Sequence, residues 1–199
     1  LTKDVTVNAL PLTDAGTDQN ICLNDSLFLG GNPTGPIGSI YSWSPAISLS
    51  DVTVANPKAK PLSTTSYYLS VTDVNGCINY DTVNITVNPL PVVVATVDTF
   101  VCANSTLQLN ASGALDYSWS PTQWLSNPQI ANPISTPREN IDYVVIGTDI
   151  NGCINTDTVK VSVFNISFEP RVTSVCFRDS VELNPIIQSG DPNLISYVW

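Results

Sequence analysis

Two twelve-residue stretches hold most of the side chains that could do chemistry. The stretch TDVNGCINYDTV, Thr72–Val83, returns as TDINGCINTDTV at Thr148–Val159. Each contains two carboxylates, an Asn-Gly pair and a cysteine, which are the groups of a metal loop or a reactive thiol site. The same residues also suit a turn between two strands, because Asn-Gly accepts the positive φ angles of a tight hairpin.

The metal reading of these stretches would use Asp73 and Asn75, or Asp149 and Asn151, as calcium ligands. An EF-hand loop also needs glycine at its sixth position and glutamate at its twelfth. Here glycine is fourth and a cysteine follows at once. The spacing therefore favours a hairpin at both places, with calcium binding as the alternative.

Catalysis by this chain alone is disfavoured by its composition. The sequence contains no histidine, which removes the commonest general base and rules out Ser-His-Asp and Cys-His centres. Carboxylates could pair for glycoside hydrolysis, but nothing in the sequence brings two of them together across a cleft; the candidates are Asp81, Asp157 and Asp179. We expect a protein that is not an enzyme and that carries no cofactor and no metal.

The charge balance excludes other classes of partner. The chain has 17 acidic and 7 basic residues and a net charge of −10. Nucleic acids and anionic lipid surfaces are bound by clustered Lys and Arg, so neither is an expected partner. No apolar run approaches the roughly 18 residues of a membrane span. The abundance of Thr, Ser, Asn, Val and Pro is typical of a β-rich protein with many turns.

An internal repeat sets the domain organisation. A shift of 76 residues places Tyr41–Asn88 on Tyr117–Phe164 without a gap, with YSWSP on YSWSP and NGCIN on NGCIN. VTVNALP at 5–11 matches ITVNPLP at 85–91, and a third copy begins around Cys176. We expect the last strand of a preceding repeat in 1–10, complete repeats in 11–88 and 89–164, and the start of a third in 165–199, so that the chain samples a longer array.

Each repeat is predicted to be a small Greek-key β-sandwich. About seven short strands in about 78 residues, with turns every 8–12 residues, fit this immunoglobulin-like all-β class. One tryptophan stands at a fixed place in every unit and is predicted to fill the core; these are Trp43, Trp119 and Trp199. Trp124 aligns with Ser48 and is not a repeat constant, so it is a candidate surface contact or an ordinary half-buried side chain.

The five cysteines are predicted to form disulfides in an oxidising compartment. None belongs to a Cys-x-x-Cys pair, and no histidine or nearby lysine would activate a thiol. Each repeat contains two cysteines, which predicts the pairs Cys22–Cys77 and Cys102–Cys153, one bridge per repeat. Such a bridge would help a unit whose core is small. Cys176 is expected to lack a partner within this stretch of chain.

The arrangement resembles the tandem immunoglobulin-like, PKD-like repeats of secreted surface proteins of Bacteroidota. The residues that carry the resemblance are the first cysteine before a strand, Tyr-x-Trp-Ser-Pro, the tyrosine before the long strand, and Asp-x-Asn-Gly-Cys followed by Asp-Thr-Val. The resemblance implies an extracellular, cell-surface adhesin, stalk or fibre exported by the type 9 secretion system, in some cases associated with gliding motility. The alternative is a carbohydrate- or calcium-binding adhesive module attached to a secreted enzyme.

The resemblance also implies modification and assembly. Asp-Ser/Thr-aliphatic triplets resemble the O-glycan acceptor of exported Bacteroidota proteins, although Asp-Thr-Val is also an ordinary strand start; the candidate acceptors are Ser26, Thr82, Thr158 and Ser180. Expected partners are neighbouring repeats, other copies that add a strand to form a fibre, and a glycan or surface ligand.

Overall fold

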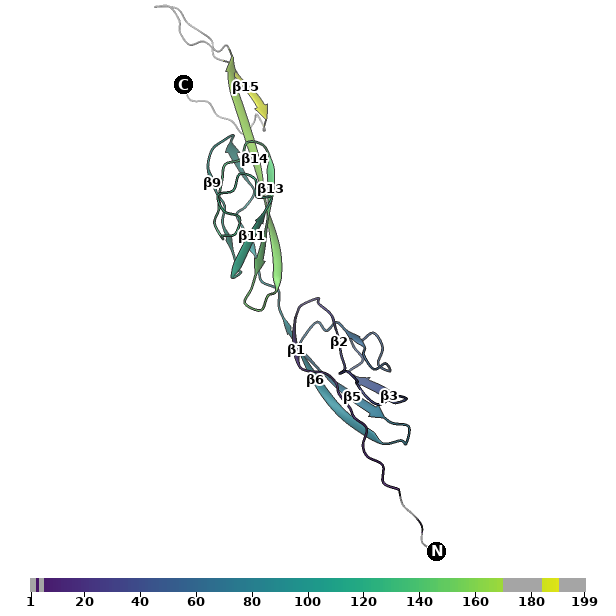
Figure 1. Cartoon of the computed structure of the whole chain (residues 1–199). Coiled ribbons are helices and arrows are strands. Elements are labelled where there is room, and N and C mark those ends of the chain that lie inside the picture. Colours follow the sequence, from purple (N-terminus) through teal and green to yellow (C-terminus); the bar gives the residue numbers. More distant parts are fainter. Residues whose placement is uncertain (1–2, 4–5, 170–183, 190–199) are drawn as a thin grey trace, which may run out of the picture. The chain divides into compact units, whose positions relative to one another are not determined.

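The computed structural model describes Lys3, residues 6–169 and residues 184–189. The predictions for Cys176, Ser180 and Trp199 lie outside these described residues. The chain divides into two compact units, Leu1–Leu90 (unit 1) and Pro91–Trp199 (unit 2). The finer division into repeats at 11–88 and 89–164 stays a prediction. In both units the regular structure of the described residues is β-strand (Figure 1).

Unit 1 is built on a four-stranded sheet in the order β1-β6-β5-β3. The strands of this sheet are β1 (Gln19–Cys22), β3 (Ile40–Ser44), β5 (Thr65–Thr72) and β6 (Ile78–Asn88). β5 and β6 form a hairpin and β3 pairs antiparallel with β5. β1 runs parallel to β6. A short ladder of β2 (Leu27–Phe28) and β4 (Lys58–Ala59) forms the second layer.

Unit 2 repeats this sheet with β11 (Asp116–Ser120), β13 (Ile141–Thr148) and β14 (Ile154–Glu169) in antiparallel order. β8 (Thr99–Cys102) runs parallel to β14, as β1 does to β6. Two ladders accompany the sheet: β7 (Val94–Ala95) with β10 (Ala111–Ser112), and β9 (Leu107–Gln108) with β12 (Ile134–Ser135). β14 continues past residue 164, where its far end pairs with β15 (Asn184–Ser189).

The core of each unit lies between the sheet and the short ladders. Period-two alternation points every second residue of β5 inward, so Tyr67, Leu69 and Val71 are fully buried while Tyr68 is exposed. β13 repeats the pattern with Tyr143, Val145 and Gly147. Leucines from the ladder side close the other wall, including Leu29 in unit 1 and Leu109 in unit 2.

One tryptophan in each core is anchored at its polar edge. Trp43 and Trp119 are 3% and 1% exposed. The Nε1–H of Trp43 donates to the Val54 carbonyl at 3.1 Å, and that of Trp119 donates to the Ile130 carbonyl at 3.0 Å. Burying the ring while satisfying its only donor avoids the cost of an unpaired buried N–H. The expected fold class, an all-β immunoglobulin-like sandwich, is confirmed, although the bridge expected within each sandwich is not, as described below.

Candidate functional site

The two Asp-x-Asn-Gly-Cys stretches are hairpin turns held by their own aspartates. Asp73 Oδ1 accepts hydrogen bonds from the backbone N–H groups of Asn75 at 2.8 Å and Cys77 at 2.9 Å. Asp149 Oδ1 accepts the equivalent two bonds, from Asn151 and Cys153, both at 2.8 Å. Each turn has a glycine at positive φ, 83° at Gly76 and 79° at Gly152, which the missing Cβ permits. The carboxylate that could have bound calcium therefore orders the turn.

The described residues contain no group of three or more His, Cys, Asp or Glu side chains that could hold a metal ion. Ca²⁺ takes six to eight oxygen ligands, and a single aspartate in each turn supplies too few of them.

The aspartates of the Asp-Thr-Val triplets accept hydrogen bonds from the segment that precedes the first strand of each sheet. Asp81 Oδ2 accepts the Ala15 N–H at 2.8 Å, and Asp157 Oδ2 accepts the Ala95 N–H at 2.8 Å. The other oxygen of each accepts the N–H of the next residue, Thr82 or Thr158, again at 2.8 Å. Each carboxylate is thus engaged by backbone N–H groups of its own unit.

The cysteines do not pair as the sequence suggested. Cys22 and Cys153 are disulfide-bonded, whereas Cys77 and Cys102 carry free thiols. The expected bridges Cys22–Cys77 and Cys102–Cys153 are therefore wrong. Burial follows bonding at equivalent positions: Cys153 is fully buried where Cys77 is half-buried, and Cys22 is half-buried where Cys102 is exposed.

The parallel register of the first strand explains why these bridges cannot form. Cys22 lies beside Asn88 at the end of β6, whereas Cys77 immediately precedes Ile78 at its start. Ten residues of extended chain separate these ends by roughly 33 Å. Cys102 lies beside Phe164 while Cys153 precedes Ile154, which gives the same separation in unit 2. A disulfide requires Cα atoms within about 7 Å.

A buried tyrosine in each unit occupies the position that the repeat predicted as the start of the long strand. The Tyr67 hydroxyl lies 2.7 Å from Ser48 Oγ. The Tyr143 hydroxyl donates to the Gln123 carbonyl at 2.8 Å and lies 2.8 Å from Ser135 Oγ. Burial raises the pKa of Tyr143 above its ordinary value, and the hydrogen bond with Ser135 opposes this only in part. The phenol is therefore a neutral structural group and not a base.

Trp124 lies at a backbone position that both units share. Its φ is 62°, and Ser48, its equivalent, has φ 65°. The carbonyl of Trp124 accepts the Thr136 N–H at 3.0 Å, as that of Ser48 accepts the Lys60 N–H at 2.8 Å. Trp124 is half-buried. The left-handed turn is thus common to the repeat, and only the indole is particular to unit 2.

Three of the four candidate O-glycan acceptors lie among the described residues. Ser26, Thr82 and Thr158 are exposed. Thr82 and Thr158 lie on the outer face of their sheets, at positions paired with Tyr68 and Val144. The aspartate of each Asp-Thr-Val triplet accepts the two backbone hydrogen bonds described above. Plain strand chemistry is therefore sufficient to account for the recurrence of these two triplets.

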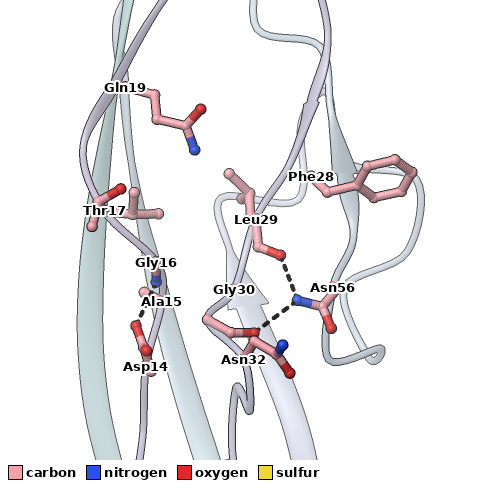
Figure 2. Close-up of a pocket in the computed structure, with 12 residues that line it drawn as sticks. Asp14, Ala15, Gly16, Thr17, Gln19, Phe28, Leu29, Gly30, Asn32 and Asn56 are labelled. Carbon is pink, nitrogen blue, oxygen red and sulfur yellow. Dashed lines mark hydrogen bonds between the residues drawn. The ribbon is translucent and has the colours of Figure 1, made fainter.

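A pocket in unit 1 was not predicted. It has a volume of about 480 Å³ and lies between the segments 14–19 and 28–32, with Asn56 at its rim (Figure 2). Gly31 lets the two segments approach closely, because a Cβ there would come within 2.0 Å of Asp14 Oδ2. The signal in the sequence was the insertion GGNPTGPIG at 30–38, which unit 2 lacks.

The polar groups of this pocket are largely occupied by one another. Asp14 Oδ1 accepts the Gly16 N–H at 2.9 Å, and the Asn56 amide donates to the Leu29 carbonyl at 2.9 Å (Figure 2). In unit 2 the equivalent segments pair as β7 and β10. The pocket is thus a consequence of the longer loop, and the hydrogen bonds of its lining residues hold that loop in place.

Comparisons with known proteins give only distant likenesses. No family model and no curated protein matches the chain. An I-band fragment of titin is similar over 80% of this chain and 68% of its own, with 12% identity and a TM-score of 0.42. The PKD domain from the KIAA 1837 protein is similar over 44% of this chain and 93% of its own, with 23% identity and a TM-score of 0.34. Extracellular domains 3–5 of Drosophila OTK are similar over 80% of this chain and 67% of their own, with 8% identity and a TM-score of 0.33.

None of these likenesses, with TM-scores below 0.5, assigns the chain a function or a partner. Within the described residues there is also no helix long and apolar enough to cross a membrane.

Proposed function

We propose that the chain is a non-catalytic structural segment of an extracellular array, in which each sandwich is one element of a stalk or fibre. The observation that carries this proposal is the recurrence of the same polar contacts at equivalent places in both units. The turn aspartates, the Asp-Thr-Val aspartates and the core tryptophans each make the same hydrogen bonds twice. Side chains that could have formed a site are used to hold the sandwich.

Two further contacts follow the same pattern. Asn79 Nδ2 donates to the Pro11 carbonyl at 3.0 Å, and Asn155 Nδ2 donates to the Pro91 carbonyl at 2.9 Å. They hold the chain in the same way where it enters each unit, so this contact is repeated along with the fold. Recurrence of the same contacts in each unit is what a repeat array predicts.

An extracellular location is supported by the redox state of the chain. Disulfides persist in oxidising compartments and are rare in reducing ones, and Cys22 and Cys153 are bonded. Placement at the cell surface, export by type 9 secretion and a role in adhesion or gliding are the finer part of the proposal and rest on the family resemblance. Antibody labelling of intact producing cells tests this part: accessible epitopes support it, and labelling only after lysis contradicts it.

The binding-module alternative rests on Trp124 and on the unit 1 pocket. Calorimetry with Ca²⁺ and a glycan array test it directly. The structural proposal predicts no saturable binding by the chain. Saturable glycan binding that is lost in Trp124→Ala, with unchanged thermal stability, would establish the adhesive module instead.

O-glycosylation at Ser26, Thr82, Thr158 and Ser180 is a separate part of the proposal. The exposure of the first three supports it, because an acceptor hydroxyl must be reachable by a glycosyltransferase. Intact-mass measurement on material from the native source tests it: added hexose-sized mass supports modification, and the bare polypeptide mass of 21.3 kDa for this segment contradicts it.

A further inference from the structure

A second pocket of unit 1, which we call the Ser48 pocket, lies beside the left-handed turn. Its volume is about 440 Å³, within the roughly 300–1,000 Å³ of small-molecule sites. Most of its wall is apolar side-chain surface, to which Ile47, Pro61 and Leu62 contribute. Ile47 and Leu62 are 76% and 70% exposed. Two large aliphatic side chains thus stand open to solvent on the walls of one pocket.

Unit 2 carries an indole on the turn that corresponds to this pocket. Ser48 and Trp124 are equivalent in the repeat, and their φ angles are 65° and 62°. The carbonyl of each accepts one backbone N–H, at 2.8 Å and 3.0 Å. Because the two turns have the same backbone form, their side chains leave from equivalent places. The repeat therefore supplies its own example of an aromatic ring on this turn, and unit 1 lacks that ring.

The hydroxyl partner of the buried tyrosine explains why unit 1 lacks it. The Tyr67 hydroxyl lies 2.7 Å from Ser48 Oγ. In unit 2 the Tyr143 hydroxyl lies 2.8 Å from Ser135 Oγ instead, and Ser135 stands where unit 1 has Ala59. Ser135 and Ala59 are both fully buried. Unit 1 thus uses its turn residue to satisfy the phenol, whereas unit 2 uses a ladder residue and leaves the turn position for an indole.

One cation stands beside the apolar walls of the Ser48 pocket. Lys60 lines the pocket, and its backbone N–H is the group that donates to the Ser48 carbonyl. None of the lining residues, all of which the structure describes, carries a carboxylate. An ammonium group is attracted to the face of an aromatic ring, most strongly to indole. The pocket therefore favours an aromatic group over an aliphatic group of similar size.

We propose that the Ser48 pocket binds an aromatic side chain of a partner protein, with tryptophan as the best fit. The ring contacts the apolar side chains of Ile47 and Leu62 and the ammonium group of Lys60. It supplies to unit 1, from outside, the ring that unit 2 carries as Trp124. The inference goes beyond the proposed structural function and concerns neither calcium nor glycans, so its failure would leave that function untouched.

Methyl NMR of the full chain, titrated with acetyl-Gly-Trp-Gly-amide, tests the proposal. We expect saturable shifts of the Ile47 and Leu62 methyl groups, with a dissociation constant on the order of 1 mM because one ring makes few contacts. Acetyl-Gly-Leu-Gly-amide is the matched probe and should bind at least about threefold more weakly, since it has no ring for Lys60. Equal affinity for the two peptides, or no saturable shift with the tryptophan peptide, would overturn the proposal.

Two variants of unit 1 locate the binding site. Ser48→Trp combined with Ala59→Ser transplants the unit 2 arrangement, which fills the pocket and keeps a hydroxyl partner for Tyr67. Leu62→Asp is an independent change that places a carboxylate on an exposed wall, where the fold tolerates it. Each variant should weaken peptide binding, read at the Ile47 methyl groups, by about tenfold or more. Binding that survives both variants would contradict the assignment.

Two controls complete the experiment. Trp124→Ala alters only unit 2 and should leave the shifts at Ile47 unchanged; their loss in this variant would count against a site in unit 1. Free indole separates a side-chain docking site from a small-molecule site. The proposal predicts that the tryptophan peptide binds at least as tightly as indole. Saturable binding of indole without binding of the peptide would refute a protein partner.

Discussion

Units 1 and 2 share one hydrogen-bonding scheme but differ at three places. Unit 1 carries the Gly/Pro loop and its pocket beside the segments that correspond to β7 and β10 of unit 2. Unit 2 has Trp124 in the left-handed turn that holds Ser48 in unit 1. The bonded cysteine is the first-strand residue in unit 1 and the hairpin residue in unit 2. What recurs maintains the sandwich, and what differs lies on loops or next to the ends of strands.

Substitution of the core tryptophans is expected to have the largest effect on the free energy of unfolding. It also tests whether the two units unfold independently. Trp119→Ala removes a fully buried indole and is expected to cost about 3–5 kcal/mol in the free energy of unfolding of unit 2. Trp43→Ala is the matched change in unit 1. Calorimetry should show one weakened transition in each variant, a different one in each case. Equal weakening of both transitions by either variant would mean that the units fold as one.

The next largest loss of stability is expected from substitution of the Asp-Thr-Val aspartates. Asp157→Asn replaces Oδ2 with an NH₂ donor or forces the amide to turn, so the Ala95 N–H loses a charged acceptor. We expect a loss of about 2 kcal/mol by urea denaturation. Asp81→Asn should cost unit 1 about the same because its bond to Ala15 is equivalent. A glycan-acceptor role alone predicts no change in stability for unmodified protein from either variant.

Tyr143 is expected to make the stability of unit 2 depend on alkaline pH. Tyr143→Phe loses hydrogen bonds to Ser135 and Gln123 and should cost about 1–2 kcal/mol near neutral pH. Because the pKa of Tyr143 is raised above 10.0, the folded state holds this proton more tightly than the unfolded chain. Its contribution is complete below pH 10 and is lost as pH rises beyond it.

Urea midpoints measured between pH 8 and pH 11 check this alkaline loss. The wild type should approach Tyr143→Phe in stability as pH rises. A gap that stays constant or widens across this range would show that ionisation of Tyr143 does not contribute.

The smallest effect is expected at Trp124. Trp124→Ser installs the unit 1 residue on the same turn, whose φ differs by only three degrees between the units. Partial loss of a half-buried indole should change the free energy of unfolding by less than about 1 kcal/mol. A loss of more than 3 kcal/mol would identify Trp124 as a core residue and remove the reason to consider it a contact.

Sequence alone predicted the strands, the hairpins and the buried tryptophan positions because each has a local cause. Asn-Gly specifies the turn, and alternation specifies which face of β5 or β13 is inward. The cysteine pairing was out of reach because it depends on a non-local fact: β1 and β8 run parallel to the last strand of their sheets. An antiparallel first strand would have reversed the direction in which Cys22 approaches the sheet, and nothing in residues 19–22 encodes that choice.

The pocket and the shared left-handed turn were missed for a similar reason. A Gly/Pro-rich loop indicates tolerance of an insertion but not the shape it encloses. Ser48 and Trp124 are both unusual residues at positive φ, so residue type gave no warning of the turn.

A tryptic map of the non-reduced, alkylated chain tests the central claim, that neither sandwich is closed by a bridge between its own two cysteines. Cleavage after Lys58, Arg138 and Lys160 places Cys22 in 4–58, Cys77 and Cys102 together in 59–138, and Cys153 in 139–160. The account predicts two alkylated cysteines in 59–138, so that this peptide is linked to neither 4–58 nor 139–160. A single species linking all three peptides would contradict it.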